Sequence, residues 1–150
     1  MTRRDDDSGT AIIEFVFVAV IVMVPLVYLV VAVAAVQRSQ LAVSQAAREA
    51  GRAFATSDTA ADARTRATAA VHLALRDQGL SEDVTVRYVP AGEPCTGAST
   101  STPRLAAGAV FTVCVIRSVD IPAVPRFLAG KGITSIGEYV VHVDDYRVVS

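Results

Sequence analysis

The hydrophobic pattern divides the chain into an apolar run, two stretches with helical spacing and a region of alternating positions. Residues 15–36 form an unbroken run of 22 apolar residues. A helix of that length rises about 33 Å, enough to cross a hydrocarbon core of about 30 Å. In lipid a lone segment must satisfy its own backbone hydrogen bonds, which only a helix does. We therefore predict one transmembrane helix, bent at Pro25 because proline removes a backbone donor.

The residues after this run keep a helical pattern. Residues 37–55 lack proline, and their apolar positions recur at helical spacing. The membrane helix is therefore predicted to continue outward through them. Its buried face is predicted to hold Val43, Ala46, Ala47, Ala50 and Phe54. Residues 56–58 then offer N-cap side chains. A second helix is predicted over residues 59–78, ending at Gly79, with the following face buried: Ala67, Ala70, Val71, Ala74 and Leu75.

Alternation of apolar and polar residues replaces helical spacing after Gly79. It predicts strands over residues 84–89, 110–119 and 136–149, the last with a bulge at Asp144 and Asp145. Stretches 91–103 and 121–132 are rich in Gly, Pro, Ser or Thr and are predicted to be loops. Helices followed by strands favour an α+β fold, with a small antiparallel sheet covered on one face by helix.

Composition narrows the class of protein. Apolar residues make up 52% of the chain, charged residues 19%, and the net charge is -1. This balance indicates a small membrane-tethered protein and argues against a nucleic-acid surface, which needs many cations to neutralise phosphates. No phosphate loop, nucleophile motif or metal-ligand spacing is present, and His72 and His142 are predicted to be structural or exposed. We expect no enzyme activity, no cofactor, no metal and no small-molecule substrate.

One carboxylate stands at the front of the apolar run. Glu14 is the only ionisable residue between Asp7 and Arg38. Three interpretations of the run compete. In the first, the run is a plain membrane anchor. In the second, it is a cleavable secretory signal with small residues at 32–34, although the apolar core of a signal is usually shorter than this run. In the third, the acid has a purpose, because a carboxylate at the edge of a membrane segment is costly.

The third interpretation agrees with the residues around Glu14. A short polar leader ends at Gly9, Glu14 follows five positions later, and Phe15 comes next. This arrangement resembles the precursors of type IV pilins, which are cut after a glycine so that a glutamate becomes the fifth residue of the mature chain. Together with the Ala-rich helix that follows, it most resembles the TadE-like minor pilins, or pseudopilins, of tight-adherence systems. The resemblance covers about the first 55 residues.

The resemblance implies a processing step and an assembly role. A membrane prepilin peptidase would cut between Gly9 and Thr10, leaving a positive amine on Thr10. Glu14 lies four positions further along a helix, where it can neutralise such an amine in its own chain or on a neighbour. Gly9 has no side chain, so its peptide bond can approach a protease closely. The implied partners are the lipid bilayer, the prepilin peptidase and other pilin-like subunits, with Glu14 and Phe15 at the assembly surface.

Cys95 falls in the first predicted loop and Cys114 in the second strand. Their spacing of 19 residues suits neither zinc nor CxxC redox chemistry. In an oxidising compartment they would form one disulfide between loop and sheet, and in a reducing one they would be unrelated thiols. We favour the disulfide.

The sequence thus predicts three parts: a leader over residues 1–9, a transmembrane helix over 10–36 and an extracytoplasmic α+β domain over 37–150. Arginines flank both ends of the span, so the positive-inside rule does not orient it. The pilin resemblance and the cysteines place the C-terminal domain outside. The predicted function is that of a pseudopilin-like subunit in assembly of a tight-adherence pilus or related secretion machinery. The alternative is a tethered or secreted binding domain, and a periplasmic hydrolase is a weaker third.

Overall fold

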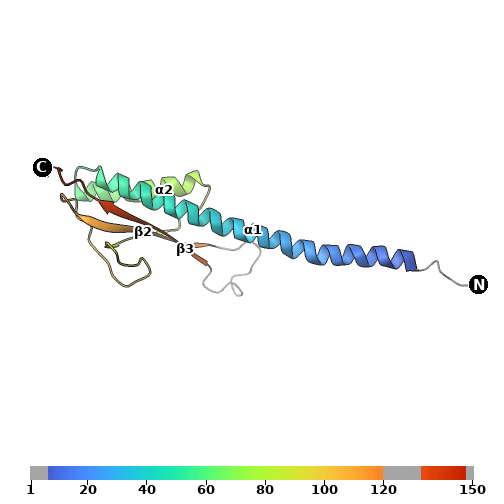
Figure 1. The fold of residues 1–150 in the computed structure, drawn as a ribbon. Coiled ribbons are helices and arrows are strands. Elements are labelled where there is room, and N and C mark those ends of the chain that lie inside the picture. The colour runs from blue at the N-terminus through green and yellow to red at the C-terminus, as the bar shows by residue number, and fades with distance from the viewer. Residues whose placement is uncertain (1–6, 120–132, 148–150) are drawn as a thin grey trace, which may run out of the picture. The chain divides into compact units, whose positions relative to one another are not determined.

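The computed structural model describes residues 7–119 and 133–147, with side chains from residue 12 onward. In chain order the elements are α1 (Asp7–Ala55), α2 (Ala60–Asp77), β1 (Thr85–Pro90), β2 (Val110–Val119) and β3 (Ile133–His142) (Figure 1). The chain divides into two compact units, residues 1–35 and 36–150. The α+β class predicted from the sequence is confirmed.

Helix α1 runs without interruption from the apolar run into the second unit. Its 49 residues include Pro25 in the interior. Within residues 36–55, the five positions of the predicted apolar stripe are all buried. Four of them are small or β-branched, namely Val43, Ala46, Ala47 and Ala50, and Phe54 ends the stripe. Small side chains let the elements packed on this face come close to the helix backbone.

Helix α2 begins at Ala60, five residues after the last residue of α1. Its N-cap is Thr59, whose hydroxyl accepts a hydrogen bond from the amide of Asp62, rather than one of residues 56–58. Four of the five positions predicted for its buried face are buried, and Ala63 replaces Ala70, which is partly exposed. Gly79 follows the helix with a φ of 64°, a left-handed conformation that glycine adopts without strain.

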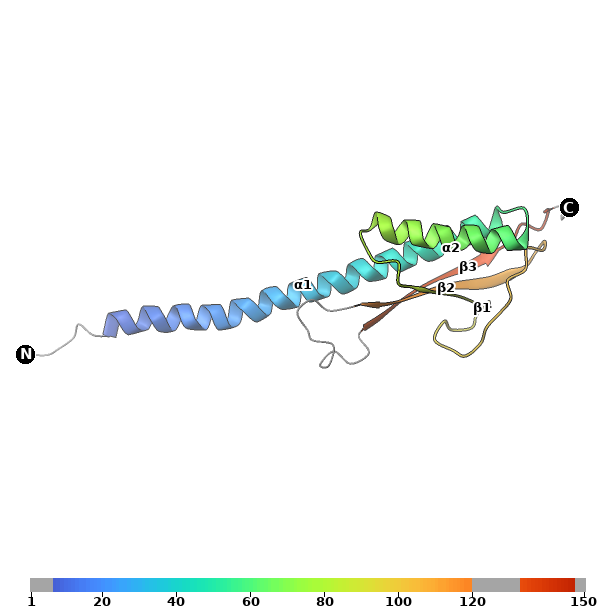
Figure 2. The same cartoon turned by 180° about the vertical axis from the view of Figure 1, so that it is seen from behind.

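The three strands form one antiparallel sheet in the order β1-β2-β3. Tyr88 of β1 pairs with Val113 of β2, and Cys114 of β2 pairs with Glu138 of β3. Figure 2 shows α2 beside the C-terminal part of α1, with both helices over one face of the sheet. That inner face supplies Phe111, Val113, Val115 and Val141 to the main core, and Phe54 packs edge-on against Phe111 with ring centroids 4.9 Å apart.

Both ends of the last predicted strand need correction, and one predicted loop lies outside the described residues. The last strand was expected over 136–149 but runs from Ile133 to His142. Asp144 and Asp145 are therefore not a bulge in it; they begin a turn in which the Asp144 carboxylate accepts from the amide of Tyr146 at 2.9 Å. A carboxylate that bonds a nearby amide in this way competes with strand pairing. The predicted loop over 121–132 falls outside the described residues.

Candidate assembly site

The predicted processing and assembly residues lie at the start of α1. Gly9 and Thr10 belong to the helix, but their side chains fall outside the described residues. Glu14 and Phe15 are both exposed, Phe15 with 74% of its surface accessible. No hydrogen bond or ion pair joins Glu14 to another of the described residues.

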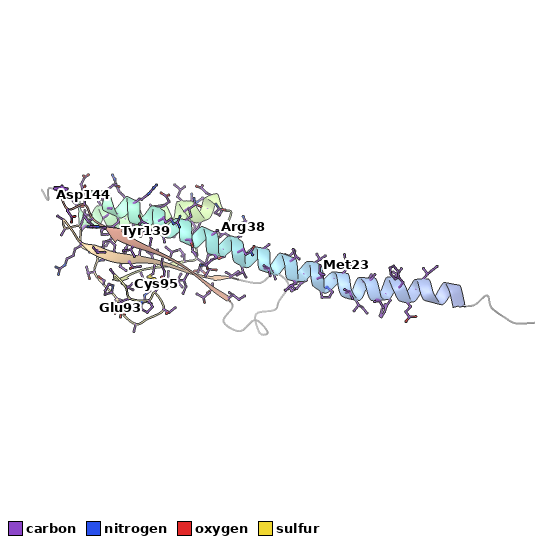
Figure 3. The ribbon with its side chains drawn as sticks, in the orientation of Figure 1. Met23, Arg38, Glu93, Cys95, Tyr139 and Asp144 are labelled. Carbon is purple, nitrogen blue, oxygen red and sulfur yellow. A yellow bond between two sulfur atoms is a disulfide. The ribbon has the colours of Figure 1, made fainter. Side chains whose placement is uncertain are left out.

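The apolar segment that follows presents its side chains outward around the whole helix. Exposed fractions of its large apolar residues range from 36% at Tyr28 to 74% at Phe15. Figure 3 shows the side chains near Met23 standing out from the helix on its different sides. Within the described residues, one helix segment, Ile12–Ala55, is long and apolar enough to cross a membrane, with a mean hydropathy of 3.1 in its most apolar window. Such a surface is stable against lipid or other apolar helices.

In the second unit, the predicted disulfide is present and joins Cys95 to Cys114, with Cα atoms 5.7 Å apart. Both sulfurs lie on the outer face of the sheet, in a small buried cluster with Val89 and with Ile136 beside it. The bond holds the loop that follows β1 against this face. It therefore covers apolar surface that the helices on the other face cannot reach.

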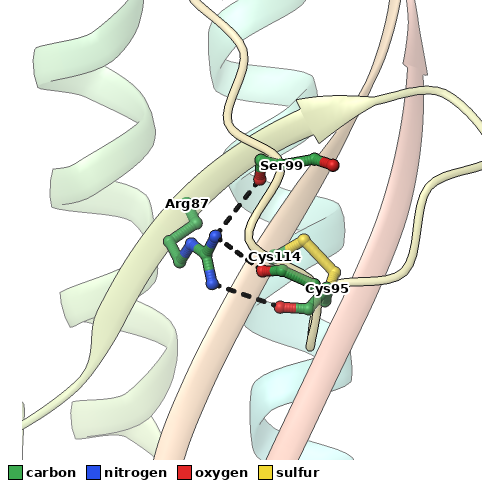
Figure 4. Close-up of a disulfide and its surroundings, with 5 residues drawn as sticks. Arg87, Cys95, Ser99 and Cys114 are labelled. Atoms are coloured by element: carbon green, nitrogen blue, oxygen red, sulfur yellow. Dashed lines mark hydrogen bonds between the residues drawn. A yellow bond between two sulfur atoms is a disulfide. The ribbon is translucent and has the colours of Figure 1, made fainter.

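Arg87 also holds this loop in place, through hydrogen bonds to its backbone. Its guanidinium donates to the carbonyl oxygens of Cys95 at 3.5 Å, Gly97 at 3.0 Å and Ser99 at 3.2 Å (Figure 4). One planar group with several donors can serve three carbonyls at once, which a lysine ammonium at the end of a flexible stem does less well. The disulfide and Arg87 thus fix the loop at neighbouring points.

Other arginines also bind backbone carbonyls. Arg38 of α1 donates to the carbonyl of Gln78, at the C-cap of α2. Arg147 donates to the carbonyl of Ala55 at 2.7 Å and to that of Ser57, where α1 ends. Both arginines supply donors to carbonyls that have no partner within their own helix, and their charge is favourable at a helix C-terminus. These contacts join parts of the second unit that are far apart in sequence.

Two glycines let α1 and β3 approach closely. A Cβ on Gly137 would overlap the backbone carbonyl of Val43, so the two backbones are in direct contact there. A Cβ on Gly51 would overlap the ring of Tyr139 and the side chain of Val141, which lie between helix and sheet. Gln40 donates to the carbonyl of Ile136 at 2.8 Å on the same line of contact. This line fixes the position of α1 along β3.

The described residues hold no group of three or more His, Cys, Asp or Glu side chains placed to bind a metal ion. His72 lies 3.1 Å from Glu82, and His142 lies 3.4 Å from Asp145. Each histidine therefore has one carboxylate neighbour among the described residues.

Comparison with known proteins adds no relative. No protein-family description, no curated protein and no solved structure matches the chain. The arguments about function therefore rest on the residues and their arrangement.

Sequence reasoning did not identify the three carbonyl-binding arginines, Gly51 or Gly137 as important. Gly137 carried a usable signal, because a glycine inside a strand pattern marks a bulge or a close backbone approach. Arg87 carried a weaker one, since it stands between Val86 and Tyr88 in an alternating strand just before a loop. Arg38 and Arg147 carried none, because their carbonyl partners come from distant parts of the sequence.

Proposed function

We propose that this protein is a pseudopilin-like membrane subunit that takes part in assembly of a tight-adherence pilus or related secretion machinery. A prepilin peptidase would cut after Gly9 and expose the amine of Thr10. The observation that carries the proposal is one uninterrupted helix in which the side chains described over residues 12–35 are apolar on every side, except for one exposed carboxylate, Glu14, near their start.

This combination suits lateral assembly within a membrane. Lipid-facing apolar side chains can exchange lipid contacts for contacts with the helices of other subunits at little cost. An unpaired carboxylate at the membrane edge is unfavourable until a cation approaches it, and the new amine of Thr10 is such a cation. Because helical residues four apart share a face, the pairing can form within one chain or between neighbours. Between chains it would fix the axial position of one subunit against the next.

The disulfide supports an extracytoplasmic position for residues 37–150, because such bonds persist in oxidising compartments. The TadE-like resemblance of the N-terminal segment agrees with that side. In this proposal the second unit contacts partner subunits, and the chain acts through assembly and performs no catalysis.

The decisive experiment determines the N-terminus of the protein extracted from its native membrane, by intact mass and N-terminal sequencing. A start at Thr10 is the expected result and makes Glu14 the fifth residue of the mature chain. A start at Met1 would leave a plain anchor, and a start near Ala35 would indicate a domain released from its signal. Either of these results would contradict the proposal.

A second experiment tests the carboxylate. Glu14→Gln keeps the shape of the side chain and removes its charge. We expect the variant to insert into membranes normally but to co-purify with partner subunits at a level reduced about tenfold, the loss of one partly buried ion pair. Asp58→Asn, which removes an exposed carboxylate between α1 and α2, serves as the control. Equal co-purification of the Glu14 variant and the wild type would remove the assembly role of this residue.

A tethered binding domain remains the second candidate, because residues 36–150 form a compact unit with its own core. The two candidates differ in what the span must do. A tether would keep its function when residues 10–36 are replaced by an unrelated transmembrane helix, whereas a pseudopilin would lose it.

A further inference from the structure

The two edges of the sheet differ. Along β1, the loop that follows the strand returns to its outer edge, and the amide of Ser101 donates to the carbonyl of Tyr88 at 2.7 Å. Along β3, no strand or loop of residues 7–119 and 133–147 pairs with the edge that faces away from β2. Within the part of the chain that the structure describes, the sheet therefore has one edge paired with a loop and one edge, along β3, without a backbone partner, which we call the open edge.

Hydrogen bonds at the ends of β3 show which backbone groups face the open edge. Val143, just past the strand, donates to the carbonyl of Ala109 and accepts from the amide of Gly108, so the groups of odd-numbered residues point toward β2. The carbonyl of Ile136 points the other way, since it accepts from the side chain of Gln40. Because these directions alternate along a strand, the N–H and C=O groups of Glu138 and Val140 face the open edge.

This edge lacks the usual protection against pairing. Natural edge strands are commonly short or carry proline or lysine, which discourage the addition of another strand. Strand β3 has ten residues and neither proline nor lysine, and Val140 on its outer face is 55% exposed. A long edge of this kind is expected to be covered in the working protein.

Helix α1 forms a wall beside the open edge. A shallow groove of about 890 Å³ is lined by α1 and β3, with Leu41, Arg48 and Arg52 on the helix and Glu138, Tyr139 and Val140 on the strand. Leu41 is 72% exposed, and neither arginine has an ion-pair partner among the described residues. The wall thus offers one apolar contact and two cations without an ion-pair partner among the described residues, with the Glu49 carboxylate between them in sequence.

We infer that the open edge of β3 binds an extended strand of a different polypeptide, which adds to the sheet at Glu138–Val140. Backbone hydrogen bonds would supply the pairing, as in other cases of strand addition. Side chains of the added strand that face α1 would be apolar beside Leu41 and acidic beside Arg48 and Arg52. Those on the outer face would be basic beside Glu138 and apolar beside Val140. This inference does not depend on cleavage after Gly9.

The direction of α1 argues against a second copy of this chain as the occupant. Gln40 contacts Ile136 and Gly51 lies beside Tyr139, so α1 and β3 run in the same direction. Two β3 strands paired about a two-fold axis would run in opposite directions, and so would their α1 segments. The two copies of Val36, to which the apolar segment is attached, would then lie at opposite ends of the pair. Copies inserted in one membrane cannot adopt this arrangement.

The test uses the full chain in detergent micelles and the peptide fluoresceinyl-Gly-Gly-Thr-Glu-Val-Glu-Lys-Val-Thr-amide, labelled at its N-terminus. Paired antiparallel to β3, the peptide presents both glutamates toward α1 and its lysine beside Glu138. One control peptide exchanges the acidic and basic residues. A second carries N-methyl groups on the amides that would face β3, so it cannot donate to the strand. Binding is measured by fluorescence anisotropy.

Saturable binding of the first peptide is expected, with no binding of the methylated one and binding at least about tenfold weaker for the exchanged one. Val140→Pro removes an amide at the open edge without removing a bond to β2, and it should weaken binding at least about tenfold. Arg48→Glu with Arg52→Glu should reverse the preference, so that the exchanged peptide binds more tightly. The matched double reversal on α2, Arg64→Glu with Arg66→Glu, should leave binding unchanged.

Several results would overturn the inference. These are the absence of saturable binding, equal binding of the methylated peptide, or equal binding by the wild type and both groove variants. A concentration-dependent self-association of the chain that Val140→Pro removes would assign the edge to a second copy instead. Circular dichroism of each variant establishes that the second unit is still folded when binding is compared.

Discussion

Residues 12–35 and residues 36–55 belong to the same helix but are built for different surroundings. The first part carries large apolar side chains that are exposed on all sides, including Phe15 at 74%. The second part buries mostly alanine, with Phe54 fully covered at its end. The more hydrophobic part of the helix is therefore the more exposed one.

This inversion shows that burial within the chain and hydrophobicity are separate properties. In the first part, which is long and apolar enough to cross a membrane, every large side chain would favour transfer from water to lipid, so the size and number of side chains count more than their fit. In the second part, the helix must fit against a sheet, and small residues permit a backbone contact between Val43 and Gly137. Substitutions in the two parts should thus have different consequences.

The largest expected effect comes from one substitution made in both parts. Phe54→Ala removes a fully buried ring that packs on Phe111, and should lower the free energy of unfolding by about 3–5 kcal/mol. Phe15→Ala should change it by less than about 0.5 kcal/mol. Urea denaturation in micelles, followed by circular dichroism, measures both. Similar losses of unfolding free energy in the two variants would contradict the proposed difference between the two parts of the helix.

Removal of the disulfide should act on the second unit alone. Cys95→Ser with Cys114→Ser opens a loop of about 20 residues, and the greater chain entropy of the unfolded state should lower stability by about 3 kcal/mol. Membrane association, measured by flotation on a density gradient, should be unchanged because residues 12–35 determine it. An unchanged denaturation midpoint in urea would contradict the structural role of this bond.

Close packing of α1 on β3 can be tested at its two glycines. Gly137→Ala places a methyl group against a backbone carbonyl that cannot rotate away, and should cost about 3 kcal/mol. Gly51→Ala meets the side chains of Tyr139 and Val141, which can shift, so we expect a smaller loss. The midpoint of thermal unfolding ranks the two variants. Gly97→Ala, where the nearest atom to an added Cβ is the Pro94 carbonyl oxygen at 3.3 Å, is the milder comparison. A larger loss at Gly51 than at Gly137 would reverse our assignment.

The smallest effect concerns Tyr88, whose hydroxyl is buried without a hydrogen-bond partner among the described residues. Burial raises the pKa of Tyr88 above 10.0, and Arg64 partly opposes this. Stability should therefore be complete below about pH 10 and fall as the pH rises toward the folded-state pKa, because the unfolded chain ionises first. Tyr88→Phe should stabilise by up to about 1 kcal/mol at neutral pH and reduce this alkaline loss. Urea denaturation curves of the wild type and of Tyr88→Phe at pH 7 and pH 10.5 measure both effects on stability.

Periodicity predicted most of the fold because each helix and strand has one buried face. The apolar stripe of residues 43–54 and the strand at 110–119 were correct in full. The last strand was misplaced because its alternation continues past His142 in the sequence, while the Asp144 carboxylate forms a local turn there. Local hydrogen bonds of this kind do not alter the hydrophobic pattern, so the pattern alone cannot locate them.

The candidate sites were predictable to different degrees. Glu14 stood out because a charge in an apolar segment is rare, and the cysteine pair needed only a choice of compartment. The open edge of β3 was not predictable, since which strand lies at an edge depends on the order of strands in the sheet. The same holds for Arg38 and Arg147, whose carbonyl partners are 40 and about 90 residues away in sequence.

The contact between Val43 and Gly137 also has a consequence for the order of folding. The C-terminal part of α1 is made early in synthesis, but the strand that covers it is nearly the last segment to be made, as is Arg147, which closes the end of α1. A core built from such distant contacts cannot form until almost the whole chain is available. The alanine face of α1 must therefore remain uncovered while translation proceeds, and only the nearly complete chain can bury it.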